Sequence, residues 1–430
     1  MKIMAKPSLY SEERISFQDP TKFNRFVEAF KRLRDELMAC GSSPRAQDKA
    51  AENSGVAKLV KDTFGVTIDF DVQSHRGNEP KYNAYMIPPQ MHKNHVLINS
   101  SNRQYHSLSQ LEKVASRNES LTADIDLDKA VIKGKLADVV IPVRVTAEFL
   151  TTSAFTPEET TAVFLHEIGH AFYWFVYLGR LFFTNHVLEA LSLEYNQNDD
   201  RRYRVELINK ASELLGLDNR ELEEFYDIKD ARVVRRALAT RSVMTRFSLT
   251  DTPVYDSTTY EALSDMFVSR LGGATHLSSA LSKIYDLYGY DVTKSRTTVM
   301  LARLFQTIIF LPFIILLLPL LILGALTNGT SEPSYDHPVD RIRRIRQDLV
   351  KHLKESKNQQ DAKLIIQDIN TVDDALSKLT KHPEFWLDAL LINLNSKELA
   401  QRKRTAVMQE LENLTTNELF VKAAILKHLS

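Results

Sequence analysis

Two histidines and a glutamate near the middle of the chain have the spacing of a metal site. The segment TAVFLHEIGH, residues 161–170, places His166 and His170 four positions apart, with Glu167 directly after the first histidine. On a helix, residues i and i+4 lie one turn apart on the same face, so both imidazoles can reach a single point about 2 Å from each nitrogen. That geometry suits zinc, and we expect His166 and His170 to be metal ligands.

Glu167 stands where a general base would stand, beside the metal instead of on it. From there its carboxylate can take a proton from a zinc-bound water and later pass that proton to the leaving amine. This is the chemistry of amide hydrolysis. Chance explains the triplet poorly in a chain with 12 histidines. The alternative is a buried helix whose histidines only satisfy hydrogen bonds.

The residues before the triplet predict where its helix begins. Thr156 can cap the helix, Pro157 fits the first helical position, and Glu159 stands where a capping-box glutamate would be. HEIGH therefore lies within a helix.

A catalytic zinc site needs a third protein ligand and one open position. The segment YEALSD offers Glu261 and Asp265, again four residues apart, on a predicted helix that ends at glycines. Glu261 can bind the metal, while Asp265 can accept the free N–H of a ligating histidine. The alternative is an exposed acidic helix face.

Taken in order, these motifs resemble a known family. TPEETTAVFLHEIGH, then YEALSD, then DHPVDRIRRI are similar to the gluzincin metallopeptidases of the CAAX prenyl protease and HtpX type, which have HExxH, a downstream ExxxD and a later His-Pro followed by arginine. The resemblance covers roughly residues 54–350. It implies a zinc endopeptidase that carries one Zn²⁺ per chain and acts on a protein or peptide. The site residues that it implies are the ligands His166, His170 and Glu261, the general base Glu167 and the supporting Asp265.

Two further parts of such a site stay open at the level of sequence. His337 or Tyr260 can stabilise the oxyanion of the tetrahedral intermediate, although His337 can equally be a structural turn residue. An extended substrate can add to an edge strand formed by YNAYMIP, residues 82–88, or by VVIPVRV, residues 139–145. Either segment can instead be an ordinary core strand.

Residues 307–326 form an apolar run without a charge, close to a hydrocarbon thickness in length at about 1.5 Å per residue. A single crossing would put Glu261 and His337 on opposite sides of a bilayer. The run is therefore either a re-entrant or monotopic anchor or a buried pair of core helices. The following RIRRIR, residues 341–346, can touch anionic head groups or be a solvated face.

Charge and cysteine content narrow the function classes. Lys plus Arg and Asp plus Glu both number 55, so no global field recruits nucleic acid. The single Cys40 cannot form an internal disulfide or a thiolate cluster, which leaves histidines and carboxylates as ligands. The N-terminal MKIMAKPSLYSEER lacks an apolar stretch of signal-peptide length. We expect a cytoplasmic protein, peripheral or monotopic on a membrane if residues 307–326 enter one.

The periodicity of the chain predicts an α+β fold. FNRFVEAFKRLRDELMACG, residues 23–41, is an amphipathic helix pattern, and residues 42–55 have the composition of a linker. Short strands, including HVLINS and a hairpin with a further strand in residues 123–150, precede the HExxH helix, and helices follow it. The expected fold is zincin-like and mostly helical, with a small mixed or antiparallel sheet packed on the HExxH helix. The expected domains are 1–53, an N-terminal helix and linker; 54–350, the catalytic domain with the apolar insert 307–326; and 351–430, a helical C-terminal region.

Three functions fit these features. The first is a zinc-dependent metalloendopeptidase. The second is a structural or scaffold protein that keeps a zincin fold but cleaves nothing. The third is a membrane-associated module in which residues 307–326 carry the function.

Overall fold

The chain divides into two compact units in a computed structural model. The first unit comprises Met1–Thr152 and His166–Asp256, and the second comprises Ser153–Leu165 and Ser257–Ser430. The residues that the structure describes are 19–40, 43–74, 82–89, 107–116, 123–127, 129–197, 200–215, 217, 222–250, 257–287, 338–356 and 359–379.

The first unit contains a three-stranded mixed sheet in the order β1-β5-β2. Strand β1 (Thr67–Gln73) pairs in parallel with β5 (Val140–Thr146), from Thr67 opposite Val140 to Gln73 opposite Thr146. Strand β2 (Ala84–Met86) pairs antiparallel with the other side of β5. Alternate residues of β5 are buried, as expected of a central strand with one covered face: Ile141, Val143 and Val145.

A separate hairpin joins β3 (Ala123–Asp126) to β4 (Val131–Gly134), which confirms the hairpin predicted for this stretch. A 3₁₀ turn, η1 (Lys135–Asp138), leads from β4 to β5. The short helix α7 (Ala147–Thr151) follows β5 directly.

Three helices precede and pack with the sheet: α2 (Pro20–Cys40), α3 (Pro44–Ser54) and α4 (Val56–Phe64). Helix α2 confirms the predicted amphipathic helix, and its Phe26 stacks on Phe64 of α4 with ring centroids 5.7 Å apart. The prediction of a linker at residues 42–55 is wrong, because this segment is α3. Ser43 caps it by accepting from the N–H of Ala46, and the next residue is a proline at the first helical position.

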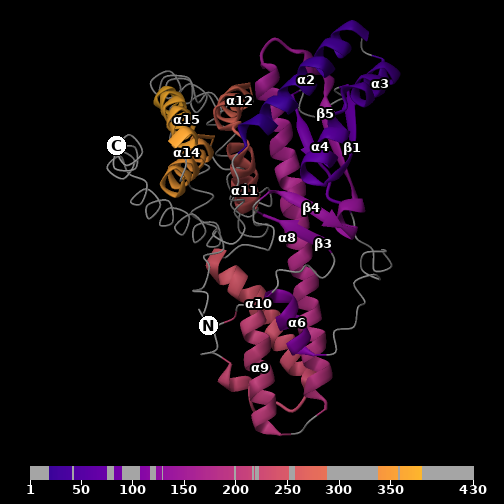
Figure 1. Ribbon diagram of the computed structural model, residues 1–430, viewed down its shortest axis with the longest axis vertical. Coiled ribbons are helices and arrows are strands. Elements are labelled where there is room, and N and C mark those ends of the chain that lie inside the picture. The colour runs from indigo at the N-terminus through magenta and orange to yellow at the C-terminus, as the bar shows by residue number, and fades with distance from the viewer. Residues whose placement is uncertain are drawn as a thin grey trace, which may run out of the picture. The chain divides into compact units, whose positions relative to one another are not determined.

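Helix α8 (Pro157–Tyr195) carries HEIGH, and His166 begins the part of it that belongs to the first unit. Figure 1 shows α6 (Leu108–Ser116), α9 (Arg201–Leu215) and α10 (Ala231–Thr250) gathered around the end of α8 that follows the histidines. Their shared core includes Leu111, Leu191, Ile208 and Val234. The described residues between His170 and the end of α10 are thus mostly helical, and they also contain the 3₁₀ turn η3 (Glu223–Phe225).

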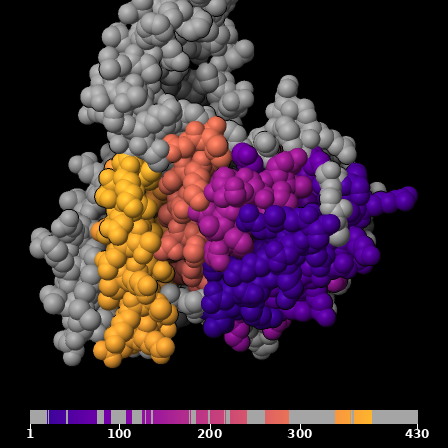
Figure 2. Space-filling view, turned by 90° about the horizontal axis from the view of Figure 1, so that it is seen from above, coloured from indigo at the N-terminus to yellow at the C-terminus, as the bar shows by residue number. Residues whose placement is uncertain are grey.

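The second unit is helical in its described part. It contains α11 (Ser257–Arg270), α12 (Ala274–Leu287), α14 (Pro338–Glu355) and α15 (Gln359–Lys378). In Figure 2 the orange surface of α14 and α15 lies against the salmon surface of residues 257–287. The apolar stripe of α14 is buried here, with Ile342, Ile345 and Leu349 at most 1% exposed.

The described residues are mostly helical with a small mixed sheet, which agrees with the predicted α+β class. Within them, no helix combines the length and the apolar character that crossing a bilayer would require. The apolar run at 307–326, His337 and the predicted strand HVLINS lie outside the described residues.

Candidate metal centre

The helix that carries the two histidines begins where the sequence predicts. The N–H of Thr156 donates to Glu159 Oε2 at 2.8 Å, and the N–H of Glu159 donates to Thr156 Oγ1 at 3.2 Å. These reciprocal hydrogen bonds form a capping box, with Pro157 as the first helical residue. The predicted start of the helix is confirmed.

Glu159 also ties this end of α8 to α12. Ser279 Oγ donates to Glu159 Oε1 at 2.5 Å, and Lys283 Nζ donates to Glu159 Oε2 at 2.7 Å. Lys283 donates in addition to the carbonyl oxygen of Ala154 at 3.0 Å. Because Glu159 is buried, its oxygens need these partners. They fix the helix about two turns before His166.

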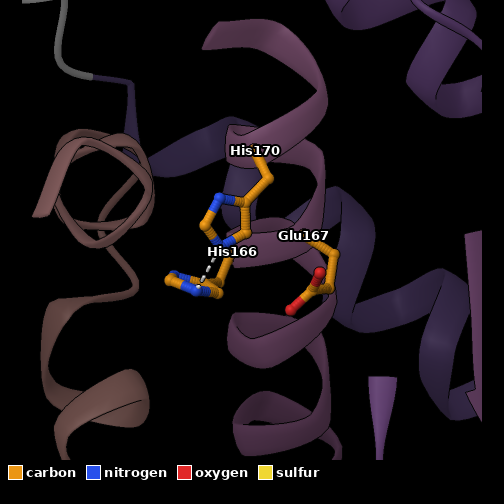
Figure 3. A group of neighbouring side chains, drawn as sticks. All are labelled: His166, Glu167 and His170. Atoms are coloured by element: carbon orange, nitrogen blue, oxygen red, sulfur yellow. Dashed lines mark hydrogen bonds between the residues drawn. The ribbon is translucent and has the colours of Figure 1, made fainter. Parts of the chain in front are cut away.

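The two imidazoles of the triplet converge. The Nε2 atoms of His166 and His170 lie 3.0 Å apart, and the ring planes meet at 84° with centroids 4.6 Å apart. Figure 3 shows the rings turned toward each other from successive turns of α8. Two nitrogens on one tetrahedral zinc, each about 2.1 Å from it, would be separated by roughly 3.4 Å. A small opening of this pair reaches that distance.

The carboxylate of Glu167 completes the group on this helix. The ligand atoms of His166, Glu167 and His170 all lie within 4.8 Å of one another. Figure 3 shows the carboxylate beside the ring of His166. Its Oε2 accepts a hydrogen bond from the backbone N–H of Met86 on β2 at 3.1 Å. This contact fixes the direction of the carboxylate and links the sheet to the helix that carries the two histidines.

The surroundings of the triplet are apolar on one side and accessible on the other. Phe164, Leu165 and Ile168 are 0% exposed, and His166 is buried with them. His170 and Glu167 are only partly buried. A bound ion would thus be held against a low-dielectric wall, and solvent would still reach the reacting groups.

The second unit contains the predicted acidic pair. Glu261 and Asp265 lie one turn apart on α11 and are 7% and 1% exposed. Both contact Arg341 of α14, whose Nη2 lies 2.9 Å from Glu261 Oε2 and 2.6 Å from Asp265 Oδ1. Burial alone would lower the pKa of Arg341, but the two carboxylates outweigh burial and raise it well above its usual value. The alternative of an exposed acidic face is wrong.

The structure corrects the prediction for RIRRIR at Arg341, whereas Arg343 of the same run is exposed, as a solvated face requires. Arg341 is 4% exposed, so it meets neither head groups nor bulk solvent. Arg346 bridges to Asp373, and Arg343 to Asp340. The sequence around Arg341 gives no signal for this burial, because its partner Asp265 lies 76 residues away in the chain.

The predicted site residues fall into two groups. His166, Glu167 and His170 are together in the first unit, and Glu261 is together with Asp265 in the second. Both carboxylate oxygens of Asp265 accept from Arg341, through Nε at 3.1 Å and Nη2 at 2.6 Å. Tyr260 belongs to α11.

The two candidate substrate strands hold different places in the sheet. VVIPVRV forms β5, which is paired on both sides and cannot accept another strand. YNAYMIP contains β2, and among the residues that the structure describes β2 pairs only with β5, on one side. The N–H of Ile87 donates to Pro142 O and the N–H of Thr146 donates to Asn83 O. The N–H of Met86 therefore faces the open side, where Glu167 accepts from it.

Comparison with protein-family models, with curated proteins and with solved structures yields no match. The geometry therefore carries the functional argument. Buried and partly buried histidine and carboxylate side chains are placed so that they could bind a metal ion. Two imidazole nitrogens with carboxylate oxygens are a ligand set that suits zinc.

Proposed function

We propose that the protein is a zinc-dependent metalloendopeptidase. In this proposal His166, His170 and Glu261 hold one Zn²⁺ per chain, and Glu167 is the general base. The observation that carries it is the convergence of the His166 and His170 Nε2 atoms, 3.0 Å apart, with a glutamate carboxylate beside them. The resemblance of HExxH, ExxxD and His-Pro to the gluzincin pattern points to the same chemistry.

The residues of the chain have distinct roles in this reaction. A zinc ion in this site would polarise the substrate carbonyl and make water acidic enough to attack at neutral pH. Glu167 takes the proton from the attacking water and delivers it to the leaving amine. Its carboxylate is held for that work by the Met86 N–H. Asp265 holds Arg341 by two hydrogen bonds, and Arg341 in turn forms an ion pair with Glu261.

The edge of β2 that no other described strand pairs with supports a proposal for the class of substrate. Ala84 and Met86 present their backbone groups on the side of β2 away from β5, so an extended peptide can add there as a further strand. The N–H of Met86 already reaches Glu167, so a peptide on this edge would pass beside the general base. We propose an extended protein or peptide segment as the substrate.

Two substitutions separate this function from a scaffold role. Glu167→Gln should retain stoichiometric zinc and lower casein hydrolysis by about 10²–10⁴-fold, because the general base is lost while the ligands stay. His166→Ala should lose both zinc and hydrolysis. Zinc is measured by elemental analysis of purified protein, and Glu158→Gln on the first turn of α8 is the matched control.

The results of these measurements distinguish the proposed mechanism from a scaffold role. Equal hydrolysis in Glu167→Gln and the parent would rule out this mechanism. Protein that binds zinc but shows no chelator-sensitive hydrolysis with any tested casein or peptide would favour the scaffold.

A further inference from the structure

Three charged side chains lie buried together between α11 and α14. Glu261, Asp265 and Arg341 are 7%, 1% and 4% exposed. The Nη2 atom of Arg341 lies 2.9 Å from Glu261 Oε2 and 2.6 Å from Asp265 Oδ1, and its Nε lies 3.1 Å from Asp265 Oδ2. One guanidinium thus binds both carboxylates.

The two carboxylates need this cation. They lie one turn apart on α11, and two buried like charges at that distance repel each other while also losing their hydration. Removing one partner of a buried ion pair leaves an uncompensated charge, which is strongly unfavourable. Arg341 is therefore the permanent counter-ion of the acidic pair.

The geometry of the guanidinium does more than neutralise charge. Its Nε and Nη2 engage both oxygens of Asp265, which is the two-pronged arrangement that only arginine can make with a carboxylate. With its plane set by Asp265, the same Nη2 reaches Oε2 of Glu261. Tyr285 of α12 also interacts with Arg341. Burial raises the pKa of Tyr285, and the charge of Arg341 together with a hydrogen bond to it opposes that shift. The direction of Glu261 is thus fixed from α14 through Asp265.

We propose that Arg341 is the positioning residue for Glu261 as a metal ligand. The ion pair between its Nη2 and Oε2 of Glu261, at 2.9 Å, holds that carboxylate in place as a ligand. This inference rests on the proposed function, because it assumes that Glu261 binds the ion. Partners that orient a ligand in this way commonly contribute about 10–100-fold to metal affinity.

The same two helices provide a matched control. Arg270 of α11 and Asp348 of α14 form a second buried ion pair, with Arg270 Nη2 3.1 Å from Asp348 Oδ1. Both residues are at most 8% exposed. Arg270 follows Glu261 by nine residues, about 13 Å along the helix. Substituting it disturbs the packing of the same helix pair far from the ligand.

The test compares zinc affinity in Arg341→Met and Arg270→Met with that of the parent. Affinity is measured by competition with a chromogenic zinc chelator, on protein whose folded fraction is checked by circular dichroism. Arg341→Met should bind zinc at least about tenfold more weakly, while Arg270→Met should stay within about twofold of the parent. Arg341→Lys should fall between, because it keeps the charge and loses the two-pronged contact.

Equal zinc affinity in Arg341→Met and Arg270→Met would overturn the inference and leave Arg341 a stabilising ion-pair residue only. If either methionine variant does not fold, the pair Arg341→Lys and Arg270→Lys decides by the same comparison. The proposed function fails separately: a parent protein that binds no zinc would remove the metal site itself. A parent that binds zinc through His166, with no effect at Arg341, would remove only the positioning role.

Discussion

Met86 is a residue whose backbone, and not its side chain, matters to the site. Its N–H donates to Glu167 Oε2 at 3.1 Å from the open edge of β2. The hydrogen bonds from β2 to β5 use the neighbouring positions instead, such as Ile87 N–H to Pro142 O. The donor at Met86 can therefore be removed without breaking the sheet, which makes its role testable.

Met86→Pro should reduce kcat/KM for an extended peptide at least about tenfold, while the far-ultraviolet circular dichroism stays that of the parent. Proline is tolerated on an edge strand where the missing N–H faces away from the ladder. The loss follows because one charge-assisted hydrogen bond to the general base disappears and the ring obstructs the edge that receives substrate. Met86→Ala keeps the N–H and should retain most activity. Unchanged kcat/KM in the proline variant would show that substrate does not use β2.

The sequence predicts the residues whose chemistry is local and misses those whose role depends on distant partners. HEIGH and the Thr156–Glu159 capping box lie within short stretches, so type and spacing are enough, and the structure confirms the cap. Local spacing predicts a surface charge at Arg341, whose partner Asp265 lies 76 residues away in the chain. Its burial follows from the packing of α14 on α11, which the sequence around it does not reveal.

At the scale of elements, Gly65 marks a close approach between α4 and the β3–β4 hairpin. It ends α4 with a φ of +72°, and its N–H donates to Lys61 O. A Cβ at this position would lie 1.8 Å from the carbonyl oxygen of Ile132 in β4. Gly55, which ends α3, has a similar φ of +69°, but a Cβ added there would meet nothing within 4 Å. Alanine substitutions at these two positions therefore separate the cost of backbone strain from the cost of steric overlap.

Gly65→Ala should lower the free energy of unfolding by at least about 3 kcal/mol. Alanine would be forced into the left-handed conformation, and the backbone of the hairpin would also have to move away from the added Cβ. Gly55→Ala should cost only about 1 kcal/mol, the penalty of the left-handed conformation. Urea denaturation followed by circular dichroism measures both. Similar losses in the two variants would mean that α4 and β4 do not meet at this point.

Element prediction from the sequence succeeds where periodicity is strong and fails where polarity hides a helix. The pattern at residues 23–41 predicts α2, and the β-branched alternation of residues 139–145 predicts β5. The polar composition of residues 42–55 favours a linker, although Ser43, Pro44 and Gly55 are start and stop signals for a helix. Pairing order is a property of the folded sheet, so only the structure shows that β5 is central and β2 an edge.

For the whole molecule, the buried His352 and the partly buried Asp368 in the second unit make stability depend on pH in opposite directions. Burial, with Arg270 nearby, lowers the pKa of His352 from 6.5 to about 4, while Asp348 opposes this shift. Burial raises the pKa of Asp368 from 3.8 to about 6. Between pH 4 and 6 the unfolded chain protonates the histidine and the folded chain protonates the aspartate, so the two effects oppose each other.

The sign for each group is definite. The stability that neutral His352 contributes is complete above pH 6.5 and is lost as the pH falls toward 4, because only the unfolded form then takes up the proton. Asp368 destabilises the folded protein above pH 6, and this cost disappears as the pH falls toward 4. The parent should therefore show a shallow pH dependence in this range.

His352→Leu should uncover the contribution of Asp368 by removing the opposing group. Relative to the parent, the free energy of unfolding of this variant should rise by about 2–3 kcal/mol between about pH 7 and about pH 4.5, at about 1.36 kcal/mol for each unit of pKa difference. Asp368→Asn should change in the other direction over the same interval, since it leaves the histidine unopposed. Urea unfolding at the two pH values measures all three proteins. Parallel pH profiles for the parent and His352→Leu would show that His352 has the same pKa in the folded and unfolded chain, and hence that α14 does not bury it against α11.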